Sequence, residues 1–147
     1  MTPDAPEHID SLTRSANDRY AVDGAARAVG IELLRVWEGG AEMRMPVTEG
    51  MLNAHGISHG GYVFLLADTT FAYAYGTRTP APVTRTADAA FLAASGRGDV
   101  LTATGRERHR AARSAVYDVT VTRAADGGDH EVIGEFRFHG VDRAPTR

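Results

Sequence analysis

The chain has 147 residues, the length of one domain, and a fold of this size buries roughly two-thirds of the surface that its unfolded form exposes. The formal net charge of −3 is modest and arginine supplies all of the positive charge, which argues against a nucleic-acid-binding protein, because such proteins gather a basic excess into one stripe. The absence of cysteine excludes disulfides, thiolate metal sites and a cysteine nucleophile.

The first thirty residues predict an N-terminal helical extension without a targeting signal. Residues 1–10 carry two prolines and three acidic residues, where a secretory signal needs a basic start followed by an apolar run. The longest apolar stretches of the chain fall far short of the ~20 residues that cross a bilayer, so we expect a cytoplasmic protein with no membrane partner. An alanine-rich run at residues 21–29 precedes Gly30 and predicts a short helix that this glycine closes.

From residue 31 the period of the apolar residues changes to two, which is typical of β-strands. Apolar and polar side chains alternate over residues 31–47 on either side of Gly39-Gly40, and this predicts a β-hairpin. Residues 60–75 predict a helix about 22 Å long, which Gly76 and two nearby prolines end.

Everything downstream of this helix predicts a sheet. Four segments have strand composition or alternation: residues 83–92, 100–107, 114–122 and 131–139. A turn is predicted at residues 126–129, and in the last strand one face is expected to carry Val132, Gly134, Phe136 and Phe138. The element order therefore predicts an α+β domain over residues 31–147, with an antiparallel sheet whose apolar face is laid against the long helix.

The long helix contains one charged residue, Asp68, among side chains that are apolar on all sides. Such a helix belongs in a core, and burying an unpaired carboxylate costs several kcal/mol. Two explanations remain open at this point. Asp68 is a general base or nucleophile in a partly dry site, or it is neutralised by an arginine or by backbone N–H groups.

The residues that precede the helix favour the catalytic explanation. Gly60 and Gly61 let a ligand approach the free N–H groups of the helix start, where the helix dipole stabilises a carbonyl oxygen that gains negative charge. Asp68 lies eight residues beyond Gly60, about 12 Å along a helix axis, so one copy cannot easily bring both to the same carbonyl. Two antiparallel copies across a two-fold axis could, which predicts a homodimer with composite sites.

The densest motif is residues 51–61, Met-Leu-Asn-Ala-His-Gly-Ile-Ser-His-Gly-Gly, which continues through Phe64, Leu66-Ala67-Asp68-Thr69 and residues 71–74. It resembles the signature of hotdog-fold thioesterases of the phenylacetic acid degradation (phenylacetyl-CoA thioesterase) subfamily. The resemblance covers most of the chain from Gly30 onward. It implies a hotdog fold, in which the sheet wraps around the long helix, an acyl-CoA substrate, no cofactor, and dimers that pair into homotetramers.

The resemblance also implies roles for individual residues. Asp68 takes the place of the catalytic carboxylate, and Gly60 supplies the N–H that polarises the thioester carbonyl from the opposite subunit. His59 and Asn53 match positions that orient substrate or water. Thr69 matches a residue beside the carboxylate, and Gly61 is expected to contact substrate.

The chain departs from the family pattern at Ala93-Ala94, where relatives usually carry Arg-Pro close to the phosphates of the cofactor. The basic cluster of residues 106–113 supplies other candidates for phosphate contact, chiefly Arg110 and Arg113, although a solvated strand-to-strand loop is the favoured interpretation. His55 and His59 stand four residues apart, but glycines near them and the lack of a helical frame disfavour a metal site, so no metal is expected.

The function expected from these residues is hydrolysis of an acyl-CoA, with an aromatic, phenylacetyl-type acyl group as one possibility. Two alternatives stay open on the sequence alone: a hotdog-fold hydratase or dehydratase that acts on acyl thioesters, and a noncatalytic module that binds acyl-CoA.

Overall fold

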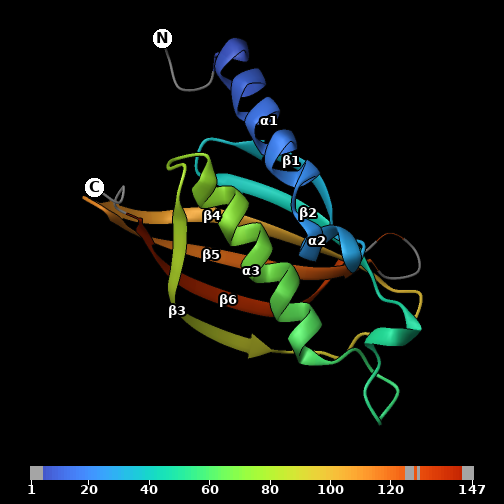
Figure 1. Cartoon of the computed structure of the whole chain (residues 1–147). Helices are drawn as coiled ribbons and strands as arrows, with labels where there is room; N and C mark the ends of the chain where they lie inside the picture. The colour runs from blue at the N-terminus through green and yellow to red at the C-terminus, as the bar shows by residue number, and fades with distance from the viewer. Residues whose placement is uncertain (1–4, 125–127, 129, 144–147) are drawn as a thin grey trace.

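The computed structural model describes residues 5–124, 128 and 130–143, and these form a six-stranded antiparallel sheet with a long helix across one face (Figure 1). The strands lie in the order β1-β2-β4-β5-β6-β3. Their bounds are β1 (Glu32–Trp37), β2 (Gly40–Pro46), β3 (Pro82–Phe91), β4 (Val100–Ala111), β5 (Ser114–Ala124) and β6 (His130–Asp142). The predicted hairpin and the α+β class are confirmed.

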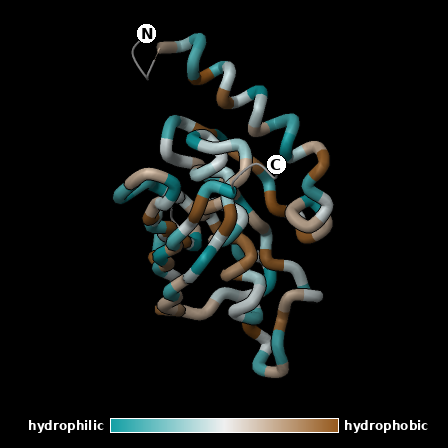
Figure 2. Tube along the Cα trace, turned by 60° about the vertical axis from the view of Figure 1, so that its left-hand side comes forward, coloured by the Kyte–Doolittle hydropathy of each residue, from teal (hydrophilic) through white to brown (hydrophobic). Residues whose placement is uncertain are grey.

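Three α-helices and one 3-10 turn complete the described chain: α1 (Pro6–Ala21), α2 (Gly24–Ala28), η1 (Glu49–Met51) and α3 (Gly60–Gly76). The helix predicted at residues 60–75 is therefore α3. Helix α1 contacts β1 near its C-terminal end, where the Tyr20 hydroxyl donates to the Ile31 carbonyl at 2.6 Å, and its other end projects away from the sheet (Figure 1). Polar and apolar residues alternate along it, as Figure 2 shows in teal and brown, so only one side packs.

Helix α3 packs against the sheet because it carries apolar side chains on nearly every side. Phe71 stacks on Phe138 of β6 at 4.9 Å between ring centroids and meets Tyr117 of β5 edge-on at 5.4 Å. This close approach needs a glycine at position 140, because a Cβ there would lie 2.7 Å from the Phe71 ring. In the described chain, no helix is long and apolar enough to cross a membrane.

Strand β6 corrects one expectation. Val121 pairs with Gly134 and Thr122 pairs with Val132, so Ile133 is an extra residue that forms a β-bulge. The bulge buries Ile133 and leaves Val132 41% exposed, so the prediction that Val132 shares a face with Gly134 is wrong. The turn predicted at residues 126–129 lies outside the described residues, apart from Gly128.

Strand β3 forms one edge of the sheet. It pairs with β6 on one side, and no other described strand lies along its second side. Residues 83–91 are all exposed or half-exposed, and Phe91 keeps 54% of its surface accessible although its ring faces α3. A free edge with apolar side chains is a surface on which another strand can pair.

Candidate active site

Asp68 lies on the side of α3 that faces the free edge of the sheet. It is half-buried, and one oxygen, Oδ1, accepts a hydrogen bond from the Thr84 hydroxyl of β3 at 2.9 Å. No ion pair to Asp68 occurs within residues 5–124, 128 and 130–143. In the described structure, the explanation that an arginine neutralises this carboxylate therefore has no support.

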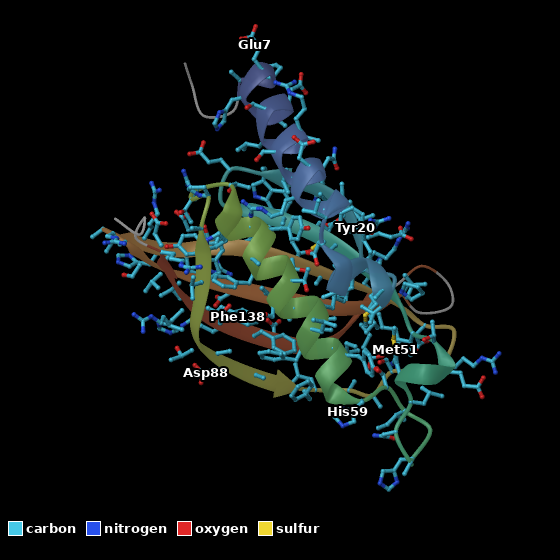
Figure 3. The ribbon with its side chains drawn as sticks, viewed as in Figure 1. Glu7, Tyr20, Met51, His59, Asp88 and Phe138 are labelled. Carbon is cyan, nitrogen blue, oxygen red and sulfur yellow. The ribbon has the colours of Figure 1, made fainter. Side chains whose placement is uncertain are left out.

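The start of α3 presents backbone donors. His59 is the N-cap, and its Nδ1 accepts the Gly61 N–H at 3.0 Å. Because Nδ1 is an acceptor, a neutral His59 carries its proton on Nε2, where it can donate outward. Gly60 N–H donates to no acceptor among the described residues, so the N–H predicted to polarise a carbonyl is available. Figure 3 shows His59 at this end of α3, close to Met51, whose carbonyl accepts the His59 N–H at 2.8 Å.

Gly60 also lies against an aromatic ring of its own chain. A Cβ at this position would come within 3.3 Å of the Phe91 ring, so the ring covers the site where a side chain would stand. Phe91 in turn meets Phe136 edge-on at 5.6 Å, and Phe64 contacts both Phe136 and Phe138. Phe91 is therefore the one member of this phenylalanine cluster that lies against Gly60 in the described structure, and Phe136 and Phe138 are buried behind it.

Asn53 shapes the loop that precedes α3. Its side-chain oxygen accepts the His55 N–H at 2.9 Å and the Ile57 N–H at 3.4 Å, which is the Asx-type turn chemistry of asparagine. The side-chain amide group has no partner in the described part of the chain and can still donate. No three His, Asp or Glu side chains among the described residues come together as a metal site requires.

Thr69 is half-buried, and its hydroxyl donates to the Leu65 carbonyl of its own helix at 2.6 Å. It therefore does not bond to Asp68, although it is the next residue along the chain. Gly61 is exposed beside His59. The two features expected to act on one carbonyl, Gly60 N–H and Asp68, stand eight residues apart on one helix, about 12 Å along its axis.

A second feature is an open groove of about 800 Å³ at the end of β3, β6 and the β4–β5 hairpin. Arg85, Arg113 and Arg143 line it together with the apolar side chains of Val83 and Val141. Arg113 therefore lies where an anion could bind, and its guanidinium also donates to the Asp142 carbonyl at 3.1 Å. Arg110 is exposed and does not line this groove.

The groove is close to Asp68 along β3. Thr84, which contacts Asp68, has two groove residues, Val83 and Arg85, as its neighbours in sequence. Val141 is next to Gly140, which faces α3, so the groove lies on the other face of the sheet.

The shifted pKa values belong to groups away from Asp68. Burial, followed by hydrogen bonding to Asp23, raises the pKa of Tyr73, so its hydroxyl stays protonated and donates to that carboxylate at 3.0 Å. Hydrogen bonds from Arg137 and Arg108 on the outer face of the sheet lower the pKa of Asp118. These contacts hold elements together and do not touch the candidate site.

Sequence reasoning missed two residues that contact the site, Thr84 and Phe91. A single sequence gives no signal for Thr84, since its contact with Asp68 spans 16 positions. The sequence places Phe91 at the end of a predicted strand. Its contact with Gly60 was not predictable, because it depends on where the end of β3 lies relative to the start of α3.

Comparison with known proteins gives a consistent result. Residues 55–128 match the Thioesterase superfamily. The chain is 41% identical over 108 residues to the acyl-coenzyme A thioesterase PaaI of Escherichia coli (strain K12), a match that covers 74% of this chain and 77% of that protein.

Solved structures agree. The structure of the E. coli PaaI protein from the phenylacetic acid degradation operon superposes with a TM-score of 0.83 at 34% identity, covering 92% of this chain and 98% of that one. The TT0310 protein of Thermus thermophilus superposes with a TM-score of 0.76 at 29% identity, covering 82% of this chain and 98% of that one.

Proposed function

The chain belongs to the thioesterase superfamily, and from this premise we propose that it is an acyl-CoA thioesterase that releases a free acid and CoA. The match of its sheet and long helix to the PaaI structure confirms the hotdog fold. The observation that carries the proposal is Asp68, a carboxylate without an ion pair in the described structure, on the same helix as the unoccupied N–H of Gly60.

In the proposed reaction, water adds across the thioester. By one route Asp68 attacks the carbonyl carbon, the C–S bond breaks, and water then hydrolyses the mixed anhydride to the free acid and the restored carboxylate; by the other, Asp68 removes a proton from a water molecule that attacks the carbon directly. In both routes the leaving thiolate of CoA takes up a proton to give the thiol. The oxygen of the carbonyl gains negative charge during this step, and the Gly60 N–H at the positive end of a helix dipole stabilises it.

We propose that Asp68 and Gly60 of one site come from two chains. Along one helix these groups are about 12 Å apart, too far to share a carbonyl. A second copy that pairs along the free edge of β3 would run its α3 antiparallel to the first and bring its Gly60 toward Asp68. The exposed apolar side chains of β3 support this homodimer, and two dimers are expected to form a homotetramer.

Three further residues are proposed to contact the substrate at the helix start. The outward Nε2–H of His59 and the free amide of Asn53 are donors that can orient the thioester or a water molecule. Gly61 leaves the first turn of α3 open to substrate. Thr69 lies next to Asp68 in the chain, but its hydroxyl donates to the backbone of its own helix. We therefore propose that Thr69 contacts the substrate and does not bind Asp68.

The acyl group is proposed to be aromatic. The E. coli relative derives from a phenylacetic acid degradation operon. Phe91, which is 54% exposed, and the half-buried Phe64 offer edge-to-face contacts to a phenyl ring, a geometry that aromatic pairs prefer, and the buried Phe136 and Phe138 pack behind them. An acyl-CoA substrate also favours the cytoplasm, the compartment expected from the sequence.

We assign the phosphates of CoA to the groove lined by Arg85, Arg113 and Arg143. Guanidinium groups bind phosphate in a bidentate manner, and the apolar side chains between them suit the adenine ring. These arginines would supply the phosphate contact that the arginine of the Arg-Pro pair supplies in relatives, at the positions of Ala93-Ala94 in this chain.

Asp68→Asn tests the proposed function. The variant keeps the shape and the hydrogen-bond acceptor but loses the charge, so we expect the release of CoA from phenylacetyl-CoA to fall by at least about a hundredfold. The measurement follows the free thiol with a thiol reagent over a panel of acyl-CoAs. Wild-type protein that binds these compounds without releasing CoA would instead identify a binding module, and equal rates for the variant would remove Asp68 from the mechanism.

A further inference from the structure

Thr84 is the residue whose side chain bonds to the carboxylate of Asp68. It comes from β3, at the edge of the sheet, whereas Asp68 comes from the middle of α3. The Thr84 hydroxyl donates to Oδ1 at 2.9 Å, and Oδ2 has no partner in the part of the chain that the structure describes. One oxygen of the carboxylate is thus held and the other is left open.

A β-bulge directs Thr84 toward α3. Thr84 pairs with Gly140 and Thr86 pairs with His139, so Arg85 is an extra residue in β3. Beyond the bulge, Ala87 and Ala89 share the inner face with their partners on β6. Continued without the bulge, this alternation would turn position 85 toward the helix and Thr84 away from it.

The nearby hydroxyls of α3 cannot replace Thr84. Thr69 and Thr70 donate to the Leu65 and Leu66 carbonyls at 2.6 and 2.7 Å, as threonines inside helices often do. Their protons are therefore committed to the helix backbone. A hydroxyl from the facing strand is the donor that reaches Asp68.

The chemistry of a carboxylate makes this contact useful. The last torsion of an aspartate is broad and roughly two-fold, so a free Asp68 would turn its oxygens through a wide range. A single hydrogen bond from a group fixed in a strand restricts that rotation and presents the second oxygen in one direction. Because reacting groups must be aligned closely, the loss of such alignment lowers the rate of the chemical step more than it weakens substrate binding.

We propose that Thr84 is a positioning residue for the hydrolytic reaction, which holds one oxygen of Asp68 and leaves the other to attack the thioester or to activate water. This inference rests on the proposed function of Asp68. Thr84 acts through Asp68 and makes no contact of its own with the reacting atoms.

The test compares three substitutions in the full-length protein with phenylacetyl-CoA. Thr84→Val keeps the shape and suits a strand but removes the donor, so kcat should fall about tenfold or more while KM changes less than about twofold. Thr84→Ser restores the hydroxyl and should recover most of kcat. Thr86→Val, on the outer face of the same strand, is the matched control and should equal wild type.

Thermal melting of each variant checks the fold, and a double variant completes the experiment. In an Asp68→Asn background, Thr84→Val should lower the residual rate no further, because the group that it positions is gone. The proposal is overturned if Thr84→Val retains kcat, if it changes mainly KM, or if serine does not restore the rate. A wild type that hydrolyses no acyl-CoA, or an Asp68→Asn variant as active as wild type, would instead overturn the proposed function.

Discussion

Gly60 shows how much a single missing side chain can matter at the start of α3. A methyl group on it would lie 3.3 Å from the Phe91 ring, so the ring would have to shift. We expect Gly60→Ala, which keeps the N–H but adds bulk beside it, to hinder an approaching carbonyl and to lower kcat on the order of a hundredfold, comparable to the loss of one donor to a developing oxyanion.

The stability of this variant should change little, because the crowded neighbour, Phe91, is 54% exposed and its ring can move. Gly50→Ala is the control, since a Cβ at Gly50 meets nothing within 4 Å. The measurement compares kcat with phenylacetyl-CoA and the melting temperature of the two variants with those of the wild type. A Gly60→Ala protein with full activity would show that no carbonyl has to approach position 60 closely enough to be hindered by a methyl group.

The residues of the candidate site were predictable to the extent that their chemistry is local. Asp68 is conspicuous because it is the one charged residue of an apolar helix. Gly60 and His59 are conspicuous because they stand where that helix begins, one as a residue without a side chain and the other as a cap. Thr84 has no such local signal. Its role depends on a bulge that reverses which residues of β3 face the helix, and composition does not reveal where an extra residue sits.

At the scale of elements, the same distinction holds. The period of 2 predicted strands, because burial of one face imposes it, and α3 was predicted from a long apolar run that glycine and proline end. The assignment of faces in β6 failed at Val132 because Ile133 is inserted into the pairing with β5. Helix α1 was foreseen only as part of a helical extension, since its polar and apolar residues are mixed and few of them pack against β1.

The elements that meet at the groove allow a prediction about CoA. Arg113 lies in the β4–β5 turn and lines the groove, whereas Arg110 does not line it. We therefore expect Arg113→Ala to raise KM for phenylacetyl-CoA about tenfold and Arg110→Ala to change it little. Arg113→Lys keeps the positive charge but lacks the guanidinium group that donates to the Asp142 carbonyl. It therefore separates the effect of phosphate contact from the effect of losing that hydrogen bond. A thioester of pantetheine, which lacks the phosphates, should be hydrolysed equally by all three variants. An equal rise in KM for both substrates would argue against phosphate binding.

At the scale of the whole molecule, the described residues leave one edge of the sheet with exposed apolar side chains open. The opposite edge strand, β1, is contacted by α1, but the second side of β3 is exposed along residues 83–91. Two chains joined there by a two-fold axis would form a continuous sheet, and each of the two sites would contain Asp68 of one chain and Gly60 of the other. This arrangement can be tested without knowing the interface in detail.

Two inactive chains should restore activity when they are mixed. Asp68→Asn and Gly60→Ala proteins, unfolded together in equal amounts and refolded, form heterodimers with one intact and one doubly altered site. Because half of randomly formed dimers are heterodimers, the mixture should reach about one quarter of the wild-type rate with phenylacetyl-CoA. Each variant carried alone through the same refolding, and a mixture made without unfolding, are the controls. If each site were built within a single chain, the mixture would give only the average of the two separate variants, because no pairing could then unite an intact carboxylate with an unobstructed N–H.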